Sequence, residues 1–77
     1  MITTRKRRIM GMKIEYRFEK HDGEYIISAF CADGYEEVKF PDIDEEAEAM
    51  FGFVVSGKAL PGTVKYVLED YALQNHF

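Results

Sequence analysis

The chain has 77 residues, of which 47% are hydrophobic and 14% aromatic, a composition that indicates one small globular domain and argues against a disordered segment. A single cysteine, Cys31, excludes an internal disulfide, and the longest apolar stretch, residues 49–55, is far shorter than the ~20 residues of a membrane-spanning helix. These features predict a cytoplasmic protein that does not act at a membrane.

The net charge of −4 is unevenly distributed along the chain. Four of the 10 basic residues precede Met12, whereas all 14 acidic residues follow it, so 6 basic and 14 acidic residues leave a net charge of −8 from Met12 onward. The basic cluster consists of Arg5, Lys6, Arg7 and Arg8. We expect residues 1–11 to form a flexible basic tail and residues 12–77 to form a single domain.

The basic tail also has an explanation at the level of the gene. The codons AGG AGG for Arg7 and Arg8 would reproduce a ribosome-binding sequence of bacterial messages, and translation would then begin at Met12. Met1 and Met10 are the other candidate starts. The tail is therefore either a true basic segment or a product of start-site choice.

The first regular pattern is that of a β-sheet. Residues 12–19 alternate apolar and charged side chains, which is the period of a strand with one buried face. The Asp22–Gly23 pair then favours a two-residue hairpin turn of the primed type. A second apolar run at 25–32 ends at another such pair, Asp33–Gly34, and the run 35–40 is a third strand. The predicted sheet is a three-stranded antiparallel meander.

The register of this meander follows from its turns, because a two-residue loop fixes which residues lie opposite each other. Pairing His21 with Glu24 and Ala32 with Tyr35 places apolar side chains of all three strands on one face. The expected opposite pairs are Phe18 with Ile27, Tyr16 with Ala29, Ala29 with Val38, and Ile27 with Phe40.

Two helices are expected to cover this apolar face. Asp42 or Asp44 would be the N-cap of the first helix and Gly57 its C-cap, and Pro61 suits the first turn of the second helix. The apolar stripes are Ile43, Ala47, Met50, Phe51, Val54 and Val55 on the first helix, and Val64, Val67, Leu68 and Tyr71 on the second. The predicted fold is a two-layer α+β domain of order β-β-β-α-α.

The sequence offers few groups for catalysis or metal binding. His21 has no histidine or cysteine partner at metal-binding or catalytic spacing, and Cys31 falls on the inward face. Residues 41–48 lack the central glycine and spaced glutamate of a helix–loop–helix calcium site, and acids are favoured at a helix start. The candidate acidic patch comprises Asp42, Asp44, Glu45, Glu46 and Glu48. We expect no enzyme activity, no cofactor and no bound metal.

The other face of the sheet carries a candidate partner surface. An apolar centre surrounded by charge is typical of binding surfaces. The alternative is that the long charged side chains simply cover the apolar ones. The candidate partner surface comprises Ile26, Phe30, Tyr35, Arg17 and Lys39.

Two resemblances to known families follow from these segments. LPGTVKYVLEDYALQ, at 60–74, resembles small uncharacterised bacterial proteins grouped as a domain of unknown function, which implies no activity. YRFEKHDGEYIISAF followed by FPDIDEEAEAM is similar to HicB-type antitoxins, which neutralise a small RNA-cleaving toxin and often carry a DNA-binding segment. The chain departs from the second pattern because it lacks the glycine and threonine that usually precede that helix.

Three functions are compatible with this sequence. The leading prediction is a non-enzymatic protein-interaction or regulatory module of bacterial type, which binds another protein or a second copy of itself. The first alternative is an acidic inhibitor of a nucleic-acid-binding enzyme, acting as a DNA mimic or as a HicB-like antitoxin. The second is a nucleic-acid tether through residues 5–8, although no aromatic residue lies among them to stack on bases.

Overall fold

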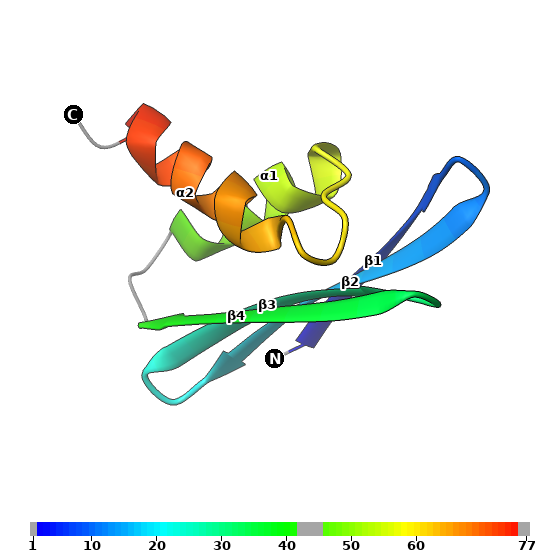
Figure 1. The fold of residues 1–77 in the computed structure, drawn as a ribbon. Helices are drawn as coiled ribbons and strands as arrows, with labels where there is room; N and C mark the ends of the chain where they lie inside the picture. The colour runs from blue at the N-terminus through cyan, green and yellow to red at the C-terminus, as the bar shows by residue number, and fades with distance from the viewer. Residues whose placement is uncertain (1, 42–45, 76–77) are drawn as a thin grey trace.

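The computed structural model describes residues 2–41 and 46–75, which form an antiparallel sheet with two helices packed against one face (Figure 1). The four strands follow one another across the sheet in chain order. The elements are β1 (Ile2–Ile9), β2 (Met12–His21), β3 (Glu24–Cys31), β4 (Gly34–Pro41), α1 (Glu46–Ser56) and α2 (Val64–Asn75). The predicted α+β class is confirmed.

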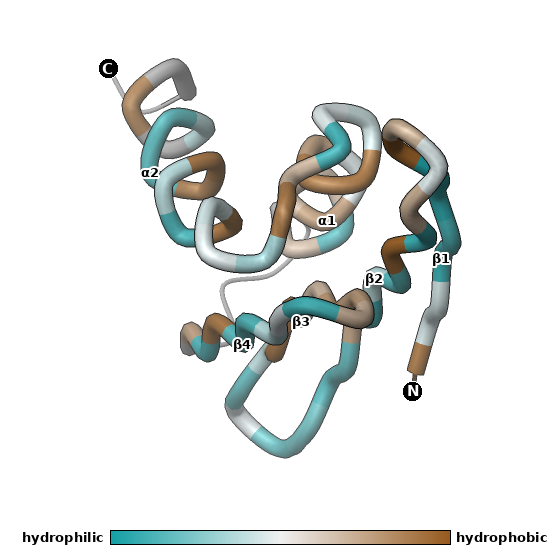
Figure 2. Tube along the Cα trace, turned by 45° about the vertical axis from the view of Figure 1, so that its right-hand side comes forward, coloured by the Kyte–Doolittle hydropathy of each residue, from teal (hydrophilic) through white to brown (hydrophobic). Residues whose placement is uncertain are grey.

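The expected three-stranded sheet is wrong, because residues assigned to a basic tail form a fourth strand, β1. β1 pairs with β2 along its whole length. The connecting residues, Met10 and Gly11, have φ angles of 51° and 81°, the two positive values that a primed two-residue turn requires. Figure 2 shows that most of β1 is hydrophilic. Periodicity missed this strand because it has no apolar row.

The hairpin between β2 and β3 has the predicted register, with Phe18 opposite Ile27 and Tyr16 opposite Ala29. Its turn differs from the prediction. Only Gly23 has a positive φ there, 72°, so the turn is not of the primed type. The two-residue loop length alone was enough to set the pairing.

The register between β3 and β4 is shifted by two residues from the prediction. Ile27 lies opposite Val38 rather than Phe40, because residues 32–33 form the turn and not residues 33–34. Side chains alternate between faces with a period of two, so this shift leaves every residue on its predicted face.

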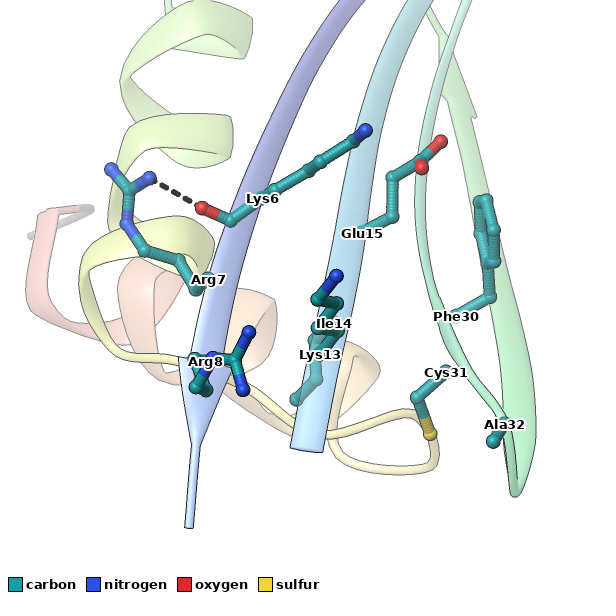
Figure 3. Close-up of a pocket in the computed structure, with 9 residues that line it drawn as sticks. All are labelled: Lys6, Arg7, Arg8, Lys13, Ile14, Glu15, Phe30, Cys31 and Ala32. Atoms are coloured by element: carbon teal, nitrogen blue, oxygen red, sulfur yellow. Dashed lines mark hydrogen bonds between the residues drawn. The ribbon is translucent and has the colours of Figure 1, made fainter. Parts of the chain in front are cut away.

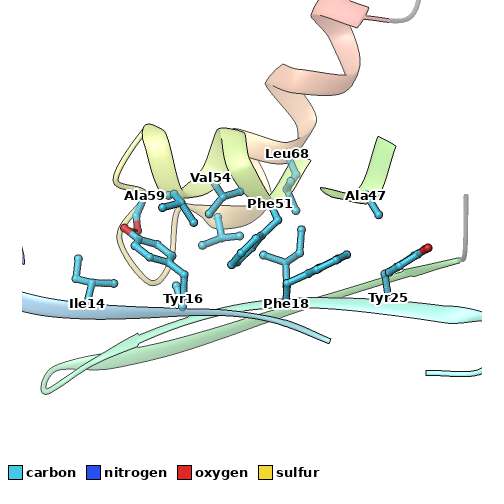
Figure 4. Close-up of a cluster of buried hydrophobic side chains, with 13 residues drawn as sticks. Ile14, Tyr16, Phe18, Tyr25, Ala47, Phe51, Val54, Ala59 and Leu68 are labelled. Atoms are coloured by element: carbon cyan, nitrogen blue, oxygen red, sulfur yellow. Dashed lines mark hydrogen bonds between the residues drawn. The ribbon is translucent and has the colours of Figure 1, made fainter. Parts of the chain in front are cut away.

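The hydrophobic core lies between the helices and the inner face of β2 and β3 (Figure 4). The Phe18 ring stacks against the rings of Tyr25 and Phe51, with centroid distances of 5.4 and 5.3 Å. The hydroxyl of the fully buried Tyr16 donates a 2.9 Å hydrogen bond to the carbonyl oxygen of Ala59, in the connection between the helices. This bond satisfies two polar groups inside an apolar core.

α1 presents its predicted stripe to the core but ends differently from the prediction. The left-handed residue of its C-terminal cap is Lys58 (φ 52°), whereas Gly57, expected in that role, has no positive φ. The N-cap predicted at Asp42 or Asp44 lies outside the described residues, as does Ile43. The stripe residues in the core are Ala47, Phe51, Val54 and Val55, with Met50 partly buried.

α2 begins at Val64 rather than at the predicted Pro61. Its first turn is capped by Glu36 of β4. The Glu36 carboxylate accepts hydrogen bonds from the N–H groups of Gly62, Val64 and Lys65 at 2.7, 2.7 and 3.1 Å. The stripe residues that contact the core are Val64, Val67 and Leu68. A strand side chain thus fixes where this helix starts.

Candidate binding surface

Within the described residues, both helices lie on one side of the sheet and leave the opposite face uncovered (Figure 1). The registers arrange the side chains of this uncovered face in rows that cross all four strands. The rows are Lys6, Glu15, Phe30 and Tyr35; Thr4, Arg17, Ser28 and Glu37; and Ile2, Glu19, Ile26 and Lys39. All five residues of the predicted partner surface therefore lie on this face.

The apolar residues of the uncovered face differ in accessibility. Ile26 is only 8% exposed, since it lies between two long side chains, Glu19 and Lys39, on the neighbouring strands. Tyr35 is 62% exposed and Phe30 is half-buried, with their ring centroids 6.1 Å apart. The two rings, and not Ile26, are the apolar groups that a partner can reach.

Arg17 is held in place by two neighbours. Its guanidinium lies 3.4 Å from the Glu15 carboxylate and 5.7 Å from the centre of the Phe30 ring. A cation at this distance over an aromatic face is attracted by the quadrupole of the ring. The Nε atom of Arg17 has no hydrogen-bond partner among the described residues. Arg17 is thus fixed in position, with its buried Nε donor unsatisfied.

Glu37 connects the two other predicted surface residues on β4. The Tyr35 hydroxyl donates a 2.8 Å hydrogen bond to Glu37, and the Nζ atom of Lys39 lies 3.6 Å from the same carboxylate. The hydrogen bond to Glu37, followed by burial, raises the pKa of the Tyr35 phenol above its ordinary value of 10.0. Tyr35 therefore presents a neutral ring at neutral pH.

A concavity of about 550 Å³ opens on the uncovered face beside the β1–β2 hairpin (Figure 3). Three cations on this face of the hairpin, Lys6, Arg8 and Lys13, line it together with Glu15 and Phe30, and the inward-facing Arg7 borders it. No ion pair between described residues involves these three cations. These three positive charges outnumber the one carboxylate of the lining, Glu15, so the concavity favours an anionic ligand. We call this feature, lined by the three cations and Phe30, the basic concavity.

The basic concavity is not predicted from the sequence, because residues 5–8 are expected there to form a flexible tail. The available signal was the Met10–Gly11 pair, which separates a segment containing β-branched residues from an alternating strand. In the fold, Phe30 lies beside the basic residues although no aromatic residue accompanies them in the sequence.

The predicted acidic patch falls mostly outside the described residues. Asp42, Asp44 and Glu45 lie outside them, and Glu46 is the first residue of α1. Glu48 is exposed on α1 and lines a second concavity, of about 370 Å³, between β1 and α1 on the helix side of the sheet. The structure thus places one acidic residue of the patch beside arginines of β1.

Searches with protein-family models, curated protein sequences and solved structures found no match to this chain. Within residues 2–41 and 46–75, neither helix is long and apolar enough to cross a membrane. In the same residues, no three His, Cys, Asp or Glu side chains are grouped so as to hold a metal ion.

Proposed function

We propose that this protein is a non-enzymatic binding module that uses the uncovered sheet face to bind another protein. The observation that carries this proposal is the accessible ring pair of Phe30 and Tyr35 beside the basic concavity. Aromatic and arginine side chains are enriched where proteins bind each other, and charged groups typically surround them. The rings would anchor the partner, and the cations would select it.

The uncovered face is suited to binding because several of its side chains are already held in place. Arg17 contacts Glu15 and Phe30, and the Tyr35 hydroxyl is hydrogen-bonded within its own strand. A surface ordered in advance loses little conformational entropy when its partner binds. Burying one large aromatic side chain contributes about 1.5–3 kcal/mol, so two rings can anchor a partner.

Replacing the central ring tests this proposal. The Phe30→Ser variant should keep the fold, since Phe30 lies outside the core, and should lose the partner. Tyr66→Ser is the matched control, because Tyr66 is 66% exposed on α2. Affinity capture from native cells with mass spectrometry should recover one partner with the unaltered protein and the control. Recovery of that partner by Phe30→Ser would overturn the proposal, and size-exclusion chromatography would report self-association in parallel.

A second candidate function is binding of single-stranded nucleic acid, which is favoured by the Phe30 ring beside Lys6, Arg8 and Lys13. Proteins of that kind combine ring stacking with phosphate pairing. Fluorescence anisotropy with a labelled oligonucleotide should then show binding that weakens in both Phe30→Ser and Lys13→Gln. A lack of binding at about 50 mM salt would remove this candidate. The acidic-inhibitor alternative stays a prediction, since most of its carboxylates lie outside the described residues.

A further inference from the structure

The free edge of β1 carries unused main-chain groups. In an antiparallel pair, alternate residues exchange hydrogen bonds with the neighbouring strand, and the residues between them direct N–H and C=O away from it. Ile9 and Met12 flank the two-residue turn and form a bonded pair. The main-chain groups of Thr4, Lys6 and Arg8 therefore face away from β2. β1 ends the sheet, so no described strand lies on that side.

Two arginine side chains show the direction of these groups. Arg5 donates a 3.1 Å hydrogen bond to the carbonyl oxygen of Thr4. Arg7 donates a 2.8 Å hydrogen bond to the carbonyl oxygen of Lys6 (Figure 3). Both bonds are exposed and join adjacent residues, so an incoming strand can replace them with a main-chain ladder. The arginines would then be released to pair with the side chains of that strand.

A concavity lies beside this edge on each face of the sheet. On the uncovered face, Lys6 and Arg8 line the basic concavity. On the helix side, Arg5 and Arg7 line the concavity of about 370 Å³ that β1 forms with α1, where two cations face the one carboxylate of Glu48. The side chains of an added strand would alternate between these two faces, as those of β1 do. Each row of the added strand would face cations of β1.

The charge of the edge selects an acidic occupant. No ion pair between described residues involves any of the four cations at residues 5–8. Opposite charges on neighbouring strands are stabilising, and like charges directly opposite each other are destabilising. A second copy of the chain that paired through β1 would place the cations of the two copies against each other, which disfavours that occupant. A nucleic acid lacks the N–H and C=O groups of a peptide main chain, so it cannot pair with the main chain of β1.

We infer that β1 binds an extended, acidic segment of the partner protein, which joins the sheet as a fifth strand. The main chain of this segment pairs with Thr4, Lys6 and Arg8. Its carboxylates pair with Arg5 and Arg7 on one face and with Lys6 on the other. This inference rests on the proposed function, because it names the chemistry of the protein partner, but it uses the sheet edge rather than the rings.

Three labelled peptides test the inference by fluorescence anisotropy with the full chain, each with eight residues to match β1. The first has consecutive glutamates at its centre, the second has glutamines there, and the third has the glutamates with N-methyl groups at alternate main-chain nitrogens. We expect the second and third to bind at least about tenfold more weakly than the first. Equal binding of the first and third peptides, or no binding of the first, would overturn the inference.

Two variants at one position distinguish the contribution of main-chain hydrogen bonds to peptide binding from the contribution of charge. Lys6→Gln and Lys6→Pro remove the same cation, but proline also removes an N–H that faces away from β2, where an edge strand tolerates it. The glutamate peptide should bind about threefold more weakly to Lys6→Gln and at least about tenfold more weakly to Lys6→Pro. Lys65→Gln, exposed on α2, is the control and should bind as the unaltered protein does. Equal binding by the two folded Lys6 variants would overturn strand addition. If Lys6→Pro does not fold, the N-methylated peptide tests the main-chain pairing instead.

Phe30→Ser distinguishes a failure of this inference from a failure of the proposed function. If no peptide binds while Phe30→Ser still loses the captured partner, the inference about the β1 edge is overturned and the proposed function stands. A single-stranded oligonucleotide of equal charge serves as competitor. Tighter binding of the oligonucleotide than of the glutamate peptide would assign the edge cations to nucleic acid and overturn the inference.

Discussion

The carboxylate of Glu36 on β4 accepts a 2.7 Å hydrogen bond from the backbone N–H of Val64, the first residue of α2. The first N–H groups of a helix have no partner within the helix and carry partial positive charge. A carboxylate at this point satisfies them and is stabilised by the helix dipole. Glu36 therefore links the sheet to α2 across 28 positions of sequence.

Removing this carboxylate should destabilise the protein. Glu36→Ala leaves several N–H groups at the start of α2 without their acceptor, so the free energy of unfolding should fall by about 1–3 kcal/mol. Glu37→Ala is the matched control, because Glu37 lies on the same strand but on the uncovered face; its loss should stay within about 0.5 kcal/mol. Urea denaturation followed by circular dichroism compares the two variants. Equal losses would contradict the capping role.

The buried hydroxyl of Tyr16 should also contribute to stability. Tyr16→Phe leaves the carbonyl of Ala59 without its donor inside the core, at a cost of about 1–2 kcal/mol in the free energy of unfolding. Tyr25→Phe is the control, since Tyr25 is also buried but its hydroxyl has no hydrogen-bond partner among the described residues. Urea unfolding at neutral pH measures both. A loss in Tyr25→Phe as large as that in Tyr16→Phe would contradict the assignment.

The same hydroxyl predicts a loss of stability in alkaline solution. Burial raises the pKa of the Tyr16 phenol above its ordinary value of 10.0, and nearby Arg7 lowers it by a smaller amount. The unfolded chain therefore loses this proton at a lower pH than the folded chain. The resulting stability is fully present below about pH 10 and is lost as the pH rises through the folded pKa. Between neutral and strongly alkaline pH, the free energy of unfolding should fall less in Tyr16→Phe than in the unaltered protein. Equal falls in the two proteins, measured by urea unfolding, would contradict this.

Alternating polarity predicted β2 and β3 because each strand has one buried row, and the turn between them brings Phe18 opposite Ile27. The same signal cannot detect the shift between β3 and β4. Val38 and Phe40 both face the core, so pairing either with Ile27 satisfies the pattern. The cap of α2 was not predictable, because no local signal connects a strand residue to a helix that follows so much later.

The candidate surface was predictable in part. Alternation placed Phe30 and Tyr35 on one face, but the burial of Ile26 depends on the side chains of the neighbouring strands. The basic concavity escaped prediction because the inward row of β1 contains Arg5 and Arg7. At the edge of a sheet these side chains reach water, so the strand forms without an apolar row.

Replacing Lys58 with glycine should stabilise the protein. The N–H of Lys58 donates to the carbonyl of Val55 at 3.1 Å, and the N–H of Ala59 donates to Val54 at 3.2 Å, which together form a Schellman cap. Glycine adopts the left-handed φ of 52° without strain, so Lys58→Gly should raise the free energy of unfolding by about 0.5–1 kcal/mol. Glu69→Gly, at an exposed position within α2, should instead lower it by about 1 kcal/mol. Thermal unfolding compares the two, and a lower melting temperature for Lys58→Gly would contradict the prediction.

A chain that begins at Met12 should fold without β1. Only Thr3 and Ile9 of this strand are half-buried, so β1 buries little apolar surface. Ordering its backbone costs about 1–2 kcal/mol per residue, which offsets most of the gain from its ladder hydrogen bonds. We expect residues 12–77 to unfold cooperatively in urea, with a free energy of unfolding within about 2 kcal/mol of the full chain. Loss of cooperative unfolding would show instead that Tyr16 and Phe18 of β2 need the neighbouring strand to remain buried.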